Sequence, residues 1–243
     1  MKPRDRILDA AMLVFRRQGF RRSSIEQTAE AAGLTRQALY HHFKSKEALF
    51  RAVIERVHEN ALAAEIAAVG AREKAGLGLA DILVAGLAAR LNQFIASFEG
   101  SPHVEELFSE HLLQARDLYQ KYAARYGAQG AATIERFCRR HKRALVRGMT
   151  AQKLSRCVEM AINGAKSAHP GMQPANAFLA DLGILVRTLV SGAVAPSPRP
   201  AKSQTKRSAR RNVETAHEHD DDQRPHRAPA RRPRCASDRR RAR

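Results

Sequence analysis

Apolar residues recur at helical spacing in one segment after another of this chain, up to about residue 195. The first segment places Ile7, Leu8 and Phe15 on one face, and Gly19 marks the expected end of that helix. Few segments show the alternation of apolar and polar residues that is typical of strands. The pattern therefore predicts an all-α protein.

Residues 24–43 predict two short helices joined by a tight turn. Ser24 and Gln27 have the spacing of a capping box, which satisfies the free amides at a helix start. Gly33 occupies the position where a helix end needs a left-handed backbone, and Thr35 can cap the second helix almost at once. The turn is too short for two independent helices, so the segment indicates a helix-turn-helix.

The second of these helices has one polar face. Leu39 is expected to pack inward, whereas Arg36, Gln37, Tyr40, His41 and Lys44 fall on the other side. Arginine can bind guanine and glutamine can bind adenine in a bidentate manner, while tyrosine, histidine and lysine can hold phosphates. A solvated helix face has the same composition, and an aromatic residue such as Tyr40 could simply pack in the core. Base recognition is thus a hypothesis.

Further helices are predicted beyond this motif. Ser45 can cap a fourth helix that runs to about Val69, and the glycine-containing segment from Gly70 to Gly78 is expected to break it. Ser101 and Pro102 suit the start of a later helix. By residue number, the predicted later helices are 79–98, 102–116, 117–126, 131–147, 150–168 and 174–194.

The chain resembles the TetR family of one-component bacterial regulators over roughly residues 4–60. The similarity lies in residues 6–11, 15–20 and 29–33, and above all in 39–49, Leu-Tyr-His-His-Phe-Lys-Ser-Lys-Glu-Ala-Leu. The resemblance implies an N-terminal helix-turn-helix DNA-binding domain followed by a larger helical domain for ligand binding and dimerisation. We expect the first to occupy residues 2–62 and the second residues 63–195.

In that family, the positions that match Arg36, Gln37, Tyr40, His42 and Lys46 commonly contact bases or phosphates. The helical face favours His41 where the family favours His42, and both stay candidates. The N-terminus of the fourth helix, with Lys46 beside it, would also favour a phosphate. The candidate DNA-binding residues are Ser24, Thr35, Arg36, Gln37, Tyr40, His41, His42, Lys44 and Lys46.

The resemblance also implies a homodimer, an inverted-repeat operator in double-stranded DNA and a small-molecule inducer. The helices at 150–168 and 174–194 would form a four-helix bundle across the two-fold axis, although an ordinary core within one chain would show the same spacing. Aromatic residues of the middle helices are candidates for the inducer site, although such residues are more often core than ligand contacts. These candidates are Phe94, Phe98, Phe108, His111, Leu112, Tyr119 and Tyr122.

The formal net charge of +19 favours a polyanionic partner. About half of that charge lies in residues 196–243, which are rich in Arg, Pro and Ala and have almost no aliphatic residues. Such a segment cannot bury enough apolar surface to offset chain entropy, so we expect it to be disordered. It could be a non-specific DNA-binding arm or an accidental extension translated from an unintended frame, and the sequence does not decide between them.

The three cysteines are odd in number and widely separated, which does not suggest a disulfide framework. Without a signal-peptide pattern or an uninterrupted apolar run of ~20 residues, we expect a cytoplasmic protein with no membrane partner. Cys138 and His141 lie three apart on one helix face, but no second pair completes a metal site. We find no nucleophile elbow, P-loop or H-E-x-x-H motif, and we expect no metal, no cofactor and no enzymatic activity.

The favoured hypothesis is a sequence-specific transcriptional regulator, more often a repressor in this family, that releases DNA when it binds an inducer. The alternative is a non-specific architectural DNA-binding protein that uses its basic tail. A helical enzyme that acts on the ligand is a less favoured third class.

Overall fold

The computed structural model describes residues 2–195, and within that range the chain forms nine α-helices and one short 3-10 helix. The first four are α1 (Pro3–Arg22), α2 (Ile25–Ala31), α3 (Arg36–His42) and α4 (Lys46–Lys74). They are followed by α5 (Leu79–Phe98), α6 (Val104–Gln114), α7 (Arg116–Arg140), α8 (Ala151–Ala168), η1 (Pro170–Met172) and α9 (Ala175–Ala193). One bridge between Leu145 and Val194 is the only β-type pairing in the described residues, so the predicted all-α class is confirmed.

The helix-turn-helix forms where the capping residues predict it. The Ser24 hydroxyl accepts a hydrogen bond from Gln27 N at 3.2 Å, and the Gln27 side chain accepts one from Ser24 N at 2.8 Å. Gly33 has a φ of 64°, as the left-handed turn requires, and Thr35 Oγ1 accepts a hydrogen bond from Ala38 N at 3.1 Å. These contacts fix the ends of α2 and α3.

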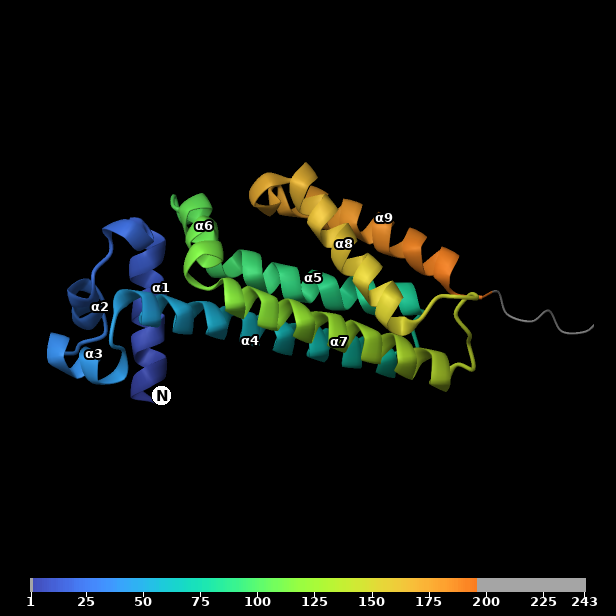
Figure 1. The fold of residues 1–243 in the computed structure, drawn as a ribbon, viewed down its shortest axis with the longest axis horizontal. Helices are drawn as coiled ribbons and strands as arrows, with labels where there is room; N and C mark the ends of the chain where they lie inside the picture. The colour runs from blue at the N-terminus through green and yellow to red at the C-terminus, as the bar shows by residue number, and fades with distance from the viewer. Residues whose placement is uncertain (1, 196–243) are drawn as a thin grey trace, which may run out of the picture. The chain divides into compact units, whose positions relative to one another are not determined.

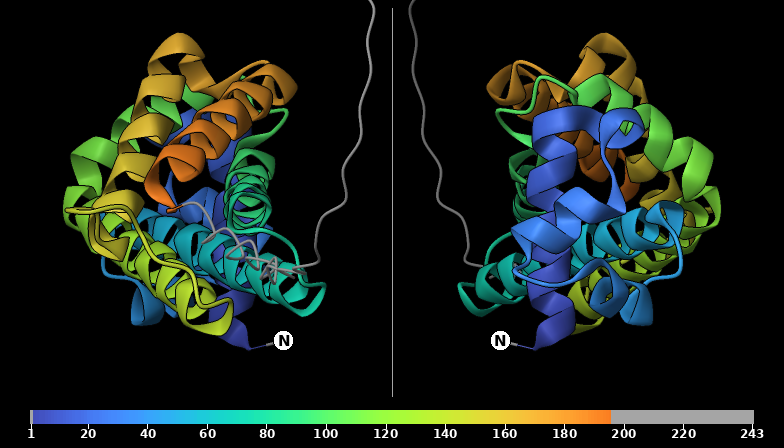
Figure 2. Two further views of the ribbon diagram at one scale, coloured as in Figure 1. Left: turned by 90° about the vertical axis from the view of Figure 1, so that its right-hand side faces the viewer. Right: turned by 90° about the vertical axis from the view of Figure 1, so that its left-hand side faces the viewer.

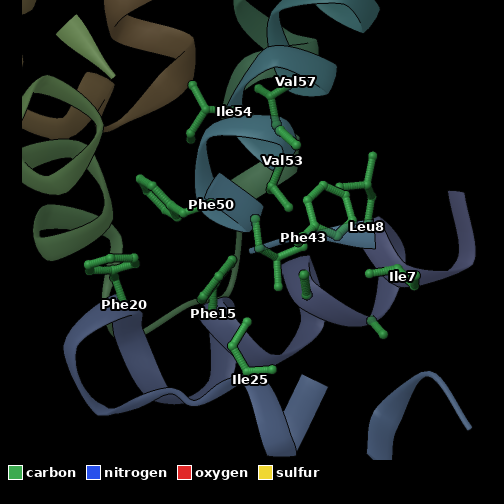
Figure 3. Close-up of a cluster of buried hydrophobic side chains, with 14 of the residues drawn as sticks. Ile7, Leu8, Phe15, Phe20, Ile25, Phe43, Phe50, Val53, Ile54 and Val57 are labelled. Carbon is green, nitrogen blue, oxygen red and sulfur yellow. The ribbon is translucent and has the colours of Figure 1, made fainter. Parts of the chain in front are cut away.

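A core of aromatic and aliphatic side chains holds α1 against α4, as Figure 3 shows. The ring centroids of Phe15 and Phe50 lie 5.3 Å apart, and those of Phe20 and Phe50 lie 4.8 Å apart. Ile25 of α2 and Leu39 of α3 are buried in the same cluster. Each buried side chain of this size contributes about 1.5–3 kcal/mol relative to exposure. The cluster therefore sets the position of α2 and α3 on α1 and α4.

The later helices form a second core. Helices α4, α5 and α7 run side by side (Figure 1), and α8 and α9 pack together against α5 and α7 (Figures 1 and 2). This core contains Leu87 of α5, Ile134 of α7, Leu154 of α8 and Phe178 of α9. Because α4 continues from the first core into the second bundle, the expected domain boundary at residues 62 and 63 falls inside one helix.

Two predicted helix breaks are wrong. Helix α4 runs through Gly70 to Lys74, and α7 runs through Gly127 and Gly130, so residues 117–126 and 131–140 belong to one helix. A glycine inside a helix costs only ~1 kcal/mol, which tertiary packing offsets. At Gly130 packing requires the small residue, because a Cβ there would lie 2.6 Å from the hydroxyl oxygen of Ser155.

Other predicted helix ends also need correction. Residues 141–147 are not helical, and α6 begins at Val104 instead of at Pro102. Ser101 does not cap α6: its hydroxyl donates a hydrogen bond to Arg16 O and accepts one from His103 N. Helix α1 does not stop at Gly19 but kinks there, with a φ of 78°, and continues to Arg22.

Helices α5 and α9 are long and apolar enough to cross a membrane by length and composition alone. Buried core helices of soluble proteins pass the same test, and α5 lies in the second core with Arg90 on it. Helix α9 leaves large apolar side chains outside the core, with Ile184 63% exposed. Leu185 and, on α8, Met160 are also exposed, so α8 and α9 present an apolar surface to solvent.

Candidate nucleic-acid interface and ligand cavity

Helix α3 has the two faces that its sequence predicts. Leu39 is fully buried, while the side chains of Gln37, His41 and His42 are exposed. Lys44, just after the helix, is exposed as well. The exposed residues form a polar strip of donors and acceptors that suits the edges of bases and the phosphates beside them.

Arg36 lies on the same strip and is held in place by neighbours. Its Nε lies 2.7 Å from Glu26 Oε1, and its guanidinium lies 5.4 Å from the centroid of the Tyr40 ring. Both charged side chains are largely exposed, so the ion pair is weak and can open when a base replaces the carboxylate. Tyr40 itself is half-buried against the first core, so one part of its side chain can pack there while the exposed part contacts a phosphate.

Lys46 is engaged inside the protein. Its ammonium donates hydrogen bonds to the carbonyls of Phe20 at 2.9 Å, Arg21 at 3.2 Å and Ser23 at 3.0 Å. It also lies 4.6 Å from the centroid of the Phe20 ring. An ammonium group has three donors, and all three are used on carbonyls at the end of α1. The predicted phosphate contact of Lys46 stays a prediction, and this geometry favours a structural role.

A cavity of about 370 Å³ lies among α4, α5, α6, α7, α8 and η1. The predicted ligand contacts that line it are Phe94, Phe108, His111, Leu112 and Tyr119. The rings of Phe94 and Phe108 stack with centroids 5.8 Å apart and form an aromatic wall. Leu112 lines the cavity and is also 53% exposed, so the cavity meets the surface beside α6.

Two predicted ligand contacts do not line this cavity. Phe98 is buried in the first core, and its ring centroid lies 5.2 Å from that of Phe108 on α6. Tyr122 stacks on the ring of His58 with centroids 4.6 Å apart, and its hydroxyl donates a hydrogen bond to Glu59 at 2.5 Å. Tyr122 therefore supports the cavity from behind. Aromatic spacing alone could not separate these supporting rings from the lining ones.

Two histidines and a tyrosine form a hydrogen-bonded chain along the cavity wall. The Nε2 atoms of His58 and His111 lie 3.2 Å apart, and His58 Nδ1 lies 2.9 Å from the Tyr126 hydroxyl. Burial, followed by the charge that His111 carries when protonated, lowers the pKa of His58 to about 3. Burial and the charge of Lys166 lower the pKa of His111 to about 4. Both imidazoles are therefore neutral near pH 7, and each can donate one hydrogen bond and accept another.

The charged residues of the cavity are unevenly paired. Arg90 Nη1 lies 3.0 Å from Glu159 Oε1 and 3.4 Å from Glu65 Oε2, and the Arg90 guanidinium lies 4.3 Å from the centroid of the Tyr126 ring. Lys166 also lines the cavity, and within residues 2–195 its ammonium makes no hydrogen bond or ion pair. Burial and the nearby Arg90 lower the pKa of Lys166 below its usual value.

Sequence reasoning missed these polar lining residues, although the sequence carries a signal for them. His58, Arg90 and Lys166 each lie on a helix next to apolar residues that face the core. A titratable residue at that place in an apolar stripe is unusual and points to a buried polar site. No cluster of three or more His, Cys, Asp or Glu that could bind a metal occurs between residues 2 and 195.

Helix α6 connects the cavity to the DNA-binding helices. It supplies part of the cavity wall, and it also contacts the end of α1. Arg21 N donates a hydrogen bond to Glu106 Oε1 at 2.8 Å, and Arg21 Nε donates one to Glu110 Oε1 at 2.9 Å. At the other end of α6, Arg51 Nη1 of α4 donates a hydrogen bond to Gln114 O at 2.7 Å. A displacement of α6 therefore reaches both α1 and α4.

Comparison with known proteins identifies the N-terminal part. Residues 7–53 match the family model described as "Bacterial regulatory proteins, tetR family". The chain is 43% identical over 60 residues to the HTH-type transcriptional regulator UidR of Escherichia coli, which covers 25% of this chain and 31% of that protein. The chain thus spans about a third of the length of the first of its curated relatives. It is 28% identical over 167 residues to the HTH-type transcriptional repressor Rv1474c of Mycobacterium tuberculosis, which covers 66% of this chain and 79% of the relative.

Solved structures share the fold over most of the chain. The structure of SmeT, the repressor of the multidrug efflux pump SmeDEF of Stenotrophomonas maltophilia, aligns with a TM-score of 0.54 at 21% identity and covers 80% of this chain and 91% of SmeT. A complex of SmeT with triclosan aligns with the same TM-score at 20% identity and covers 82% of this chain and 99% of that one. At these identities the likeness establishes the fold, an N-terminal helix-turn-helix domain followed by a helical domain.

Proposed function

We propose, since the chain belongs to the TetR family of bacterial regulatory proteins, that it is a sequence-specific DNA-binding transcriptional regulator, and specifically a repressor that a small molecule releases from DNA. The observation that carries the proposal is the capped helix pair α2–α3, with the polar face of α3 exposed and its apolar face buried. Such a helix can enter the major groove, where the edges of the four base pairs differ. The family is one of regulators rather than enzymes, and we place the protein in the cytoplasm.

We assign base recognition to Arg36 and Gln37, and phosphate contacts to Tyr40, Lys44 and the two histidines at 41 and 42. The exposure of these side chains, with Tyr40 half-buried, supports the assignment. Ser24 and Thr35 accept hydrogen bonds from amides at the starts of α2 and α3, so we assign them the part of fixing these helix ends at the surface that faces DNA.

The functional unit is a homodimer joined through α8 and α9. The exposed apolar side chains of Met160, Ile184 and Leu185 support this interface, because a surface of this kind is normally covered by a partner. A two-fold dimer presents two copies of α3 and therefore requires an inverted-repeat operator. Its half-site centres should lie about 34–36 Å apart, or near a multiple of that distance.

Regulation would pass from the cavity through α6. A ligand in the cavity contacts Phe108 and His111 of α6, and the same helix holds Arg21 of α1 through Glu106 and Glu110. A ligand that binds better when α6 has shifted would favour the conformation that does not fit DNA. SmeT, in its complex with triclosan, is a structural neighbour that binds a small molecule.

The experiment is a selection of bound sequences from a random DNA library, made with the full-length chain and with residues 1–195. The proposal predicts that both proteins select the same inverted repeat, and that the shorter one binds all DNA more weakly because it lacks the basic tail. Insertion of about five base pairs between the half-sites should abolish tight binding, since it turns one groove to the opposite face.

The rival function, a non-specific architectural binder, makes the opposite prediction. Residues 196–243 would then supply the affinity, and the selection would return no motif from either protein. The charge of that segment is the observation that favours the rival, and its structure lies outside the described residues. A motif recovered from residues 1–195 would exclude it.

A further inference from the structure

The cavity beside α6 contains one cationic side chain, Lys166, that has no ion-pair partner within residues 2–195. Among its lining residues, Arg90 and Lys166 are cationic and Glu159 is anionic. The carboxylate of Glu159 is already bound by Arg90 at 3.0 Å, with Glu65 on the same guanidinium. The ammonium of Lys166 is left without a hydrogen bond or ion pair from residues 2–195.

The two imidazoles of the cavity supply no negative charge to pair with Lys166. His58 and His111 bind each other through Nε2 and are neutral near pH 7, because burial lowers the pKa of both. They therefore add hydrogen-bonding capacity but no counter-ion. The remaining wall is mostly apolar and aromatic, with Leu91, Phe94 and Phe108 facing the same space, and it includes the amide of Asn163.

From this arrangement we infer that the cavity binds an amphipathic organic acid, whose carboxylate pairs with Lys166 and whose apolar body lies against Phe94 and Phe108. The inference rests on the proposed function, because it names the class of effector for the same site. A neutral occupant would remove water from Lys166 without replacing it, and a cationic occupant would add a second unpaired charge. A carboxylate would pair with the one ammonium that lacks a partner.

The cationic and the aromatic parts of the lining come from different helices. Lys166 comes from α8, whereas the stacked pair Phe94 and Phe108 comes from α5 and α6. A cavity of about 370 Å³ lies near the lower end of the range for small-molecule sites. An acid with one aromatic ring and a short chain is therefore a suitable size.

Three matched probes test the inference: phenylbutyrate, phenylbutanamide and phenylbutylamine, which share an apolar body and differ in the charge of the head group. Their affinities for the full-length protein are measured by isothermal titration calorimetry. We expect the acid to bind at least about tenfold more tightly than the amide, and the amine to bind most weakly. Equal binding of acid and amide, or no binding of the acid, overturns the inference without any variant being made.

Variants then locate the charge. Lys166→Met should reduce the affinity for phenylbutyrate to that for the amide, and Lys166→Glu should reverse the preference toward the amine. Lys153→Met is the matched control, because Lys153 lies on the same helix but outside the cavity and donates to Gly148 O. An acid preference that survives Lys166→Met in a folded protein assigns the charge elsewhere and overturns the inference.

These results are separable from the test of DNA binding. A protein that selects an operator but shows no acid preference retains the proposed function and loses this inference. A protein that prefers the acid but selects no DNA motif retains the ligand class and loses the proposed function.

Discussion

Replacing Gly19 with alanine should loosen the contact between α1 and α6. Gly19 has a φ of 78° and a ψ of 169°, a backbone conformation that is essentially restricted to glycine. An alanine forced into it costs about 1–3 kcal/mol. A Cβ would also lie 2.8 Å from Glu106 Cδ, so the carboxylate would have to move away.

The displaced carboxylate is the one that accepts a hydrogen bond from Arg21 N at 2.8 Å. Loss of one such bond costs about 0.5–1.5 kcal/mol. The free energy of unfolding should therefore fall by about 2–4 kcal/mol, and the Tm by roughly 5–15 °C for a chain of this size. Gly76→Ala is the matched control, since Gly76 also has a positive φ, 71°, but no atom within 4 Å of the added Cβ.

A double-mutant cycle separates strain from contact. Urea denaturation is measured for the wild type, Gly19→Ala, Glu106→Ala and the double variant. Glu106→Ala should cost about 1 kcal/mol alone and close to nothing in the Gly19→Ala protein, where the bond is already broken. Additive losses, or a Gly19→Ala protein no less stable than Gly76→Ala, would refute the contact as the cause.

Three further outcomes are expected. Ser24→Ala should lower the free energy of unfolding by about 1 kcal/mol in urea titrations through loss of the capping box, and an unchanged midpoint would contradict this role. The cavity histidines His58 and His111 have pKa values of about 3 and 4 in the folded protein and near 6.5 in the unfolded chain. The unfolded chain therefore binds more protons in acid. The free energy of unfolding should fall as the pH drops from about 6.5 toward 4. His111→Gln should remove about half of that slope, which reaches ~1.4 kcal/mol per pH unit for each histidine, and an unchanged slope would contradict the assignment. Ile184→Lys should dissociate the dimer in sedimentation experiments, while Leu13→Lys, at another exposed apolar site, on α1, should not. A dimer that survives the first substitution would exclude this part of α9 from the interface.

The sequence predicted the helix-turn-helix well because its ends depend on local chemistry. The caps at Ser24, Thr35 and Ser45 and the left-handed Gly33 each involve residues within a few positions of one another. The helices 79–98, 150–168 and 174–194 were also predicted to within one residue at each end, because strong apolar stripes or a capping threonine define them.

Errors arose where contacts between distant segments decide the outcome. The pattern predicts separate helices at 117–126 and 131–147, yet Gly130 lies inside α7, where Ser155 of α8 packs on it. Ser101 was assigned to a helix cap, yet its hydroxyl binds Arg16 of α1. Tyr122 was assigned to the ligand, yet it stacks behind His58. No local pattern contains these pairings.

Base recognition by the exposed face of α3 is tested most directly by a selection of DNA sequences with Gln37→Ala beside the wild type. Gln152→Ala, an exposed glutamine on the distant helix α8, is the matched control. The wild type and the control should return the same inverted repeat, while Gln37→Ala should lose its preference at one base pair in each half-site, at a cost of about 1–3 kcal/mol per half-site. Identical motifs from all three proteins would contradict base recognition by Gln37, and the absence of any motif from the wild type would contradict sequence-specific binding altogether.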